Sequence, residues 1–207
     1  MAVGRYLLMD SATPLMQVAV VEKGRAIAAE SAVGHAVDLL SPLVENLMAR
    51  GEFNFADADG MICCSGPGSS MGLKSALISA KVWKIFSPKA LILLQYCSLD
   101  MCLRLNRDAN TVCVPWRGDV FIAKSADCDA VTRVHRSELQ SRVGTLLLNS
   151  RRTRPAECES FPDANYCITA ADFDILSICS EFSGELKDYG EFCYEKCATA
   201  AGAWNDD

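Results

Sequence analysis

A glycine-rich stretch, SGPGSSMGLKS from Ser65 to Ser75, holds the residues best suited to chemistry. It follows the apolar run GMICC and precedes the apolar run ALISAKVWKIF, so it is predicted to join a strand to a helix. Glycines at such a turn let backbone N–H groups point toward a phosphate, and the helix adds its positive end. A serine at the same kind of turn is instead the nucleophile of many hydrolases. The stretch therefore raises two chemical hypotheses.

The glycine spacing fails both standard phosphate-binding patterns. The dinucleotide-binding pattern GxGxxG requires a glycine where Met71 stands. A Walker A loop requires a glycine directly before the lysine, whereas Leu73 separates Gly72 from Lys74. A looser anion-binding turn remains. Its contacts would come from the loop and from the end of an earlier strand: Asp10, Thr13, Gly66, Gly68, Ser69 and Gly72.

The hydrolase hypothesis rests on the segment 68–72, which matches GxSxG with Ser70 as the nucleophile. His135 would be the base, and the acid would be one of three aspartates upstream of it, Asp119, Asp127 or Asp129. The surroundings argue against this hypothesis, because Ser65, Gly66 and Pro67 separate the strand from the motif and His135 ends a predicted strand. We therefore expect no catalytic residue and keep Ser70 with His135 as the alternative.

Composition limits the class of protein. The 207 residues are 50% hydrophobic and 22% charged, which suits a globular protein with a sizeable core. The net charge of −6 disfavours binding of nucleic acid by this chain alone. The eleven cysteines include no CxxC pair, so we expect them to be free and buried. The two histidines, His35 and His135, form neither HExxH nor HxxxH, so no metal site is expected.

The apolar segments are all short. The N-terminal run is too short for a signal peptide, and no run reaches the length of a membrane-spanning helix. The cytoplasm is therefore the expected location, and no contact with a membrane is expected.

Hydrophobic periodicity predicts an α/β chain in two parts. In the first part we expect strands at 4–10, 16–22 and 25–31, a helix at 36–50, a strand at 60–64, a helix at 71–86, a strand at 90–95 and a short helix at 98–106. In the second part we expect strands at 111–118, 119–127 and 130–136, a helix at 137–150 capped by Ser137, a strand at 165–170 and a helix at 172–182. Pro42 should delay or kink the first helix.

The two parts have the element orders βββαβαβα and βββαβα. Three antiparallel strands followed by parallel strands with crossover helices describe a ribonuclease-H-like half. Two such halves make the architecture of the actin-like ATPase superfamily. The polar stretch NRDAN at 106–110 separates them, so we expect an N-terminal half at 1–106 and a smaller C-terminal half at 107–207.

An actin-superfamily ATPase or nucleotide-binding protein is a further alternative, in which Asp10 and Thr13 would face phosphates and Mg²⁺. Such an enzyme needs a second glycine-rich loop, and the second half offers only the isolated Gly118, Gly144 and Gly184. ATP or ADP is therefore expected to bind weakly or at a surface shared with a partner, with no tightly bound cofactor.

Three motifs together resemble the TsaB family, also called YeaZ. They are DSAT at 10–13, the segment from His35 to Pro42, and GPGSSMGL at 66–73, and the resemblance covers about residues 5–100. The family pattern has Phe-Thr where this chain has Ser70-Met71, and arginine where it has Lys74. Near the C-terminus, the family's P-x-Y-L-R is only faintly echoed at 192–196.

The resemblance implies a role in making threonylcarbamoyladenosine, the modified adenosine next to the anticodon of tRNA. In this family the TsaB subunit is non-catalytic, and the histidine metal ligands lie in its partner TsaD. It implies a heterodimer with a TsaD-like protein, a TsaE-like ATPase in the larger complex, contact with tRNA only through that complex, and self-association as a homodimer. The family's glycoprotease-like label comes from its kinship with TsaD.

The helix expected at 71–86 is apolar over most of its circumference, so it should be covered on two sides. One stripe is Leu73, Ala76, Leu77, Ala80 and Trp83, and the other is Ile78, Val82, Ile85 and Phe86. One side faces its own sheet, and the other is covered by the first helix or by a partner protein. By resemblance, the interface with the partner is expected at Leu40, Val44, Leu47, Met48, Leu73, Ala76, Leu77, Ala80 and Trp83.

Overall fold

The computed structural model describes residues 4–12, 15–105, 109–117, 120–128, 130–140, 145–149, 166–169 and 187–188. One sheet contains β1 (Arg5–Asp10), β2 (Leu15–Glu22), β3 (Arg25–Val33), β4 (Gly60–Cys64), β5 (Ile92–Tyr96) and β11 (Lys187–Asp188). The other contains β6 (Thr111–Arg117), β7 (Val120–Ser125), β8 (Val131–His135), β9 (Thr145–Asn149) and β10 (Tyr166–Thr169). The helices are α1 (Ala36–Ala49), α2 (Ser70–Phe86), α3 (Ser98–Leu105) and α4 (Arg136–Gln140).

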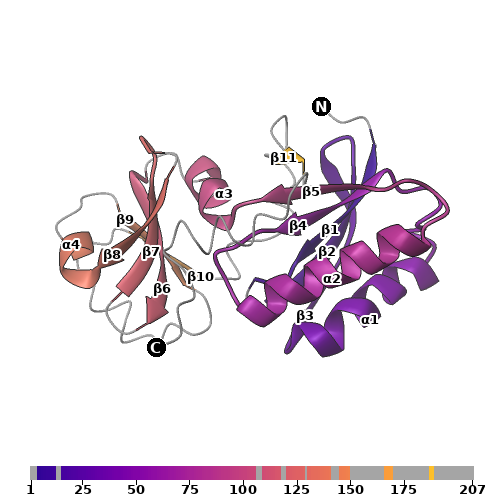
Figure 1. The fold of residues 1–207 in the computed structure, drawn as a ribbon, viewed down its shortest axis with the longest axis horizontal. Coiled ribbons are helices and arrows are strands. Elements are labelled where there is room, and N and C mark those ends of the chain that lie inside the picture. Colours follow the sequence, from indigo (N-terminus) through magenta and orange to yellow (C-terminus); the bar gives the residue numbers. More distant parts are fainter. Residues whose placement is uncertain are drawn as a thin grey trace.

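The two sheets lie side by side, with α3 between them (Figure 1). The first has the strand order β11-β5-β4-β1-β2-β3 and the second the order β10-β9-β6-β7-β8. In the first sheet β2 pairs antiparallel with β1 and β3, while β1, β4 and β5 run parallel. The predicted element order of the N-terminal half is confirmed.

The turn between β2 and β3 follows from its sequence. Lys23 and Gly24 both have positive φ, 51° and 76°, as a two-residue type I′ turn requires. Glycine adopts this backbone without cost, and the right-handed twist of the two strands favours it. This turn makes β2 and β3 antiparallel neighbours.

Helices α1 and α2 cover one face of the first sheet (Figure 1). The core between them and the sheet includes Leu7, Met9 and Val18 from the strands and Leu40 and Leu47 from α1, all at most 1% exposed. Helix α1 begins at Ala36, as the range 36–50 predicted, and it continues through Pro42, so the alternative of a delayed start is wrong. Burial of the apolar side of α1 outweighs the backbone hydrogen bond that the proline cannot make.

The opposite face of the first sheet shares a core with the second half. One cluster joins Leu8 and Ile62 of the first sheet to Leu99 of α3 and to Val112 and Ile122 of the second sheet. An ion pair between Lys124 of β7 and Asp100 of α3 adds a polar link. The two halves are therefore held together by continuous apolar packing.

The two adjacent cysteines of β4 point to opposite faces, as predicted. Cys63 lies in the cluster under α1 and α2, and Cys64 in the cluster that reaches α3. Of the cysteines that the structure describes, Cys63, Cys64, Cys102 and Cys113 are buried and Cys128 is exposed. Burial raises the pKa of the Cys63 thiol to about 12, so this thiol is neutral at physiological pH.

The second half departs from the sequence prediction at 137–150. Instead of one helix, the chain forms the short α4, ending at Gln140, and then β9, which pairs parallel with β6 and β10. The run TLLLN is apolar without a clear period, and such a run suits a buried strand as well as a helix. Ser137 does not precede the helix as a cap, because α4 already begins at Arg136.

Other predictions in the second half have different outcomes. The strand expected at 165–170 is confirmed as β10, and β11, which pairs antiparallel with β5, was not predicted. The helix expected at 172–182, the family echo at 192–196 and Thr13 lie outside the described residues. The boundary expected after residue 106 falls between α3 and β6. None of the described helices is long and apolar enough to cross a bilayer.

Candidate functional site

The loop of residues 65–69 leads from β4 into α2, and several of its N–H groups are bonded within the protein. The Ser69 N–H donates to the Ala12 carbonyl oxygen at 2.7 Å. The Ser69 hydroxyl oxygen accepts from the Gly72 N–H at 3.3 Å, which makes Ser69 the N-cap of α2. The Ser11 hydroxyl donates to the Gly72 carbonyl oxygen at 2.8 Å. These bonds fasten the loop to the end of β1 and leave those N–H groups unavailable to a phosphate.

Two glycines of the loop are explained by close packing. A Cβ added to Gly72 would lie 1.8 Å from the Ser11 carbonyl oxygen, and one added to Gly68 would lie 2.5 Å from the Ala12 carbonyl oxygen. Only a residue without a side chain permits backbones to approach this closely. The glycine pattern therefore places the start of α2 against the turn after β1.

The GxSxG alternative lacks the geometry of a nucleophile elbow. Ser70 is the first residue of α2, and Lys23 is the one non-glycine residue with positive φ in the described chain, so Ser70 does not have the strained backbone of an elbow. His135 lies on β8 at the outer edge of the second sheet, away from α2 (Figure 1), and its Nδ1 is 3.0 Å from the Ser137 hydroxyl. Asp127 is exposed, and Asp119 and Asp129 lie outside the described residues.

A labelling experiment tests the serine directly. We expect a fluorophosphonate probe to label the wild-type protein no more than Ser70→Ala, because His135, the base that the motif would need, lies on β8 in the second sheet. The readout is in-gel fluorescence, with an active serine hydrolase as the positive control. Labelling that disappears in Ser70→Ala would establish a serine nucleophile.

The candidate nucleotide residue Asp10 is buried and already paired. One carboxylate oxygen accepts from the Tyr96 hydroxyl at 2.5 Å, and the other accepts from the Ala12 N–H at 2.9 Å. The Asp10 and Tyr96 side chains are each 5% exposed. Burial raises the pKa of Asp10 above its ordinary value, against the two hydrogen bonds, which lower it. Burial and the neighbouring Asp10 raise the pKa of Tyr96 well above its ordinary value.

These residues do not fit a metal-bound phosphate. A metal ligand needs a carboxylate oxygen that faces the ion, and both oxygens of Asp10 face protein donors. Among the described residues, no group of three or more histidine, cysteine, aspartate or glutamate side chains is placed to hold a metal ion. Sequence reasoning missed Tyr96, although a polar aromatic at the end of the buried run LILLQY was a usable signal.

Most of the residues expected at the partner interface are buried within the chain, where they form part of its own core. The side chains are at most 7% exposed at Leu40, Val44, Leu47, Leu73, Ala76, Leu77 and Ala80. Leu73 belongs to the cluster beneath α3, and all the others except Leu77 belong to the cluster between α1, α2 and the sheet. Trp83 is half-buried against Phe55, and of the nine residues Met48 alone is exposed, at 40%.

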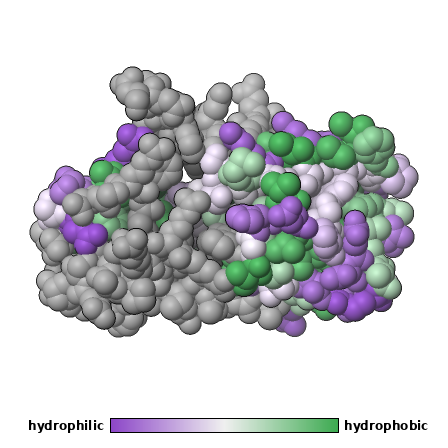
Figure 2. Space-filling view, turned by 90° about the horizontal axis from the view of Figure 1, so that it is seen from below, coloured by the Kyte–Doolittle hydropathy of each residue, from purple (hydrophilic) through white to green (hydrophobic). Residues whose placement is uncertain are grey.

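The apolar surface that a partner can reach lies on the other stripe of α2. Met71, Ile78, Val82, Ile85 and Phe86 are 42–81% exposed, and Val37 and Met48 of α1 are exposed too. We define the α2 seam as Met71, Ser75, Ile78, Val82 and Ile85, whose spacing alternates between four and three residues. This is the spacing of a helix that packs along another helix. Figure 2, seen from below Figure 1, shows hydrophobic and hydrophilic residues side by side on the described part of the surface.

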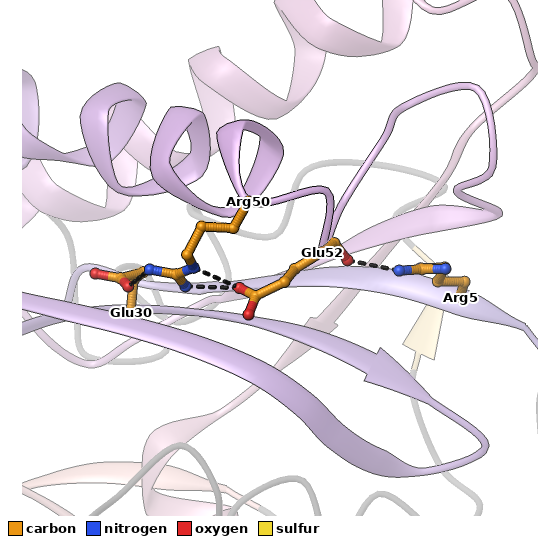
Figure 3. A network of polar contacts seen from close by, with 4 residues as sticks. All are labelled: Arg5, Glu30, Arg50 and Glu52. Atoms are coloured by element: carbon orange, nitrogen blue, oxygen red, sulfur yellow. Dashed lines mark hydrogen bonds and ion pairs between the residues drawn. The ribbon is translucent and has the colours of Figure 1, made fainter.

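The C-terminal end of α1 is fixed by ion pairs. Arg50, its C-cap, contacts Glu30 of β3 and donates from Nε to Glu52 at 2.8 Å (Figure 3). Arg5 of β1 donates to the Glu52 carbonyl oxygen. This set connects the end of α1 to two strands, although exposed ion pairs add little stability.

Comparison with known proteins agrees with this architecture. No protein-family model matches the chain, and no curated protein matches its sequence. Two solved structures from Pseudomonas aeruginosa are similar in fold, each with a TM-score of 0.63. One, described as an uncharacterized protein with similarity to peptidase YEAZ, is 15% identical over 89% of this chain and 94% of its own. The other, YeaZ, is 16% identical over 97% of this chain and 99% of its own.

Proposed function

We propose that the chain is a non-catalytic subunit of the TsaB type, built from two ribonuclease-H-like halves in the actin-like arrangement. In this proposal it binds a TsaD-like protein through α1 and α2 and supports synthesis of threonylcarbamoyladenosine on tRNA. The observation that carries the proposal is the exposed α2 seam in a chain of YeaZ-like fold. Four of its five residues are exposed large apolar side chains, with Ser75 between them, and a group of exposed apolar side chains on one helix often marks a surface that another protein covers.

The chemistry of the seam indicates the kind of partner surface. Helix α2 carries Lys74, Lys81 and Lys84 and no acidic residue. An apolar stripe with lysines beside it favours a partner helix whose own apolar stripe is bordered by acidic side chains. The same face would serve for self-association when the partner is absent. A TsaE-like ATPase and tRNA would join through the larger complex, in the cytoplasm.

Alternative functions need chemistry that the described residues do not bring together. The hydrolase needs Ser70 beside a base, and the nucleotide-binding protein needs Asp10 turned toward a ligand. The glycoprotease-like label of the family therefore receives no support from a catalytic group in the described residues.

A pair of matched variants tests the partner surface. Ile78 and Ile27 are both exposed isoleucines, at 59% and 53%, but Ile27 lies on β3, away from the α2 seam. We expect Ile78→Asp to weaken binding of the TsaD-like protein of the same organism by about tenfold or more, because a charge in the seam must be desolvated on binding. Ile27→Asp should bind like wild type. Isothermal titration calorimetry measures both.

The Ile78→Asp variant should fold, because its new carboxylate would lie at helical spacing from Lys74 and Lys81. A wild-type chain that does not bind the TsaD-like protein would reject the proposed function. Equal affinities for Ile78→Asp and wild type would reject the seam as the site of binding. Growth of a TsaB-depleted bacterium on the wild-type chain measures the role in tRNA modification.

A further inference from the structure

Three parallel strands end in a row of side chains at one edge of the first sheet. Asp10, Cys64 and Tyr96 are the last residues of β1, β4 and β5. Met9 is in register with Cys63, and Cys64 with Tyr96, so the three strand ends lie next to one another. Open α/β sheets bind their ligands outside the carboxyl ends of parallel strands, near the point where the strand order reverses. This is therefore the edge at which the actin-like arrangement would predict a ligand.

At these strand ends a tyrosine hydroxyl, and not a bound ligand, contacts the Asp10 carboxylate. The Tyr96 side chain starts on β5, and its hydroxyl reaches Asp10 on β1, with β4 lying between the two strands. Leu99 and Cys102 of α3 belong to the same apolar cluster and are fully buried. The row thus lies beneath α3, in the core that joins the two halves.

The glycine loop is fastened to the same strand end. The Ser65 N–H and hydroxyl both donate to the Tyr96 carbonyl oxygen at 2.8 Å. The Ser98 N–H, at the start of α3, donates to the Gly66 carbonyl oxygen at 3.0 Å. With the bonds from Ser11 and Ser69, the loop connects the end of β1 to the end of β5.

We propose that the Tyr96 hydroxyl occupies the place of a ligand at the strand ends, so that Asp10 cannot bind a metal-bound nucleotide. The contacts of Tyr96 also hold β1, the glycine loop and α3 together, and we call this arrangement of Asp10, Tyr96 and the loop the lock. The lock keeps the two halves in one arrangement without a bound nucleotide. This inference goes beyond the proposed function and does not depend on which protein covers the α2 seam.

The lock should make the stability of the protein depend on pH. Among the described residues, Asp10 and Tyr96 affect the pKa of each other, Cys64 of β4 affects that of Tyr96, and Asp10 raises that of Cys102 on α3. All four groups are acids. The folded pKa of Asp10 is raised, so its contribution to stability is greatest below its ordinary value of 3.8 and falls as the pH rises through the folded pKa. Removing the Tyr96 hydroxyl removes a donor that lowers this pKa. The stability deficit of Tyr96→Phe should therefore widen from about pH 4 to about pH 7.

Thermal unfolding with matched variants tests the proposal. We expect Tyr96→Phe to lower Tm by about 4–10 °C at neutral pH, and by less in acid, because Asp10 loses the buried hydrogen bond from the Tyr96 hydroxyl. Tyr6→Phe, on β1 but at the end away from Asp10, should lower Tm by under about 2 °C at both pH values. Millimolar Mg-ATP or Mg-ADP should leave the wild-type Tm unchanged.

Two results would overturn the lock. One is a Tyr96→Phe profile that matches Tyr6→Phe at both pH values. The other is a rise in wild-type Tm with Mg-ATP or Mg-ADP that Asp10→Asn abolishes. If Tyr96→Phe does not fold, the wild-type nucleotide titration, with Asp10→Asn as its control, still decides. Neither result bears on the Ile78→Asp binding measurement, so the lock and the proposed function can fail separately.

Discussion

Gly72→Ala is expected to lower the free energy of unfolding by about 3 kcal/mol, because the added methyl group would overpack a site that has no space for it. Its Cβ would lie 1.8 Å from the Ser11 carbonyl oxygen, which is backbone and cannot rotate away. The first turn of α2 would have to move from β1, and the hydrogen bond from the Ser11 hydroxyl to the Gly72 carbonyl oxygen would be lost.

Whether Gly72→Ala lowers or raises the free energy of unfolding distinguishes two reasons for a glycine at position 72. In a helix with free space, replacing glycine by alanine stabilises the protein by up to about 1 kcal/mol. If Gly72 served only to let a ligand approach, Gly72→Ala would therefore retain or gain stability and lose ligand binding. Urea unfolding measures the difference, with Ser79→Ala on the same helix as a control expected to stay within about 0.5 kcal/mol of wild type.

Leu47→Ala is expected to destabilise the protein by about 2–5 kcal/mol, because it leaves a cavity in a closely packed core. Leu47 is fully buried between α1 and the sheet. Its neighbour Met48 is 40% exposed, so Met48→Ala should change stability by no more than about 0.5 kcal/mol. Denaturant unfolding of the two variants, side by side, measures the contrast.

The same pair tests which residues face a partner. Because Leu47 is inside, Leu47→Ala should weaken binding only through the loss of folded protein, and binding should recover at a temperature where the variant is folded. Met48, on the accessible face, is the one of the two that a partner can contact. Equal stability of Leu47→Ala and Met48→Ala would show that the burial of Leu47 is wrong.

The packing of the glycine stretch gives it a role different from phosphate binding or nucleophilic catalysis. Its glycines permit a close contact with the turn after β1, and Ser69 caps α2. The stretch thereby fixes the start of the helix that carries the exposed seam. In the proposed function, its contribution to tRNA modification is to hold that helix where a partner reaches it.

Local sequence determined much of the first half. Apolar runs bounded by turn residues predicted the strands and helices up to α3, and the Lys23-Gly24 turn made β2 and β3 antiparallel. The opposite orientation of Cys63 and Cys64 also followed from the alternation of a strand. These features depend on neighbours along the chain, which the sequence displays directly.

Only the tertiary structure decided which apolar stripe of α2 faces inward. Both stripes have helical spacing, so periodicity predicts a helix with two apolar sides without saying which side meets the sheet. Packing against α1 and the strands buries Ala76 and Ala80 and leaves Ile78 and Val82 outside. The choice between helix and strand at β9 was likewise made by pairing with β6, not by the run TLLLN itself.

The polar contacts of the site were also decided in three dimensions. Asp10 and Tyr96 are 86 residues apart, and Ser11 and Gly72 are 61 apart, so no local spacing predicts either contact. The sequence supplied a carboxylate, a tyrosine and a glycine of unknown purpose. The parallel order of β1, β4 and β5 brought the ends of those strands together, and burial turned the carboxylate from a candidate ligand into a hydrogen-bonded part of the core.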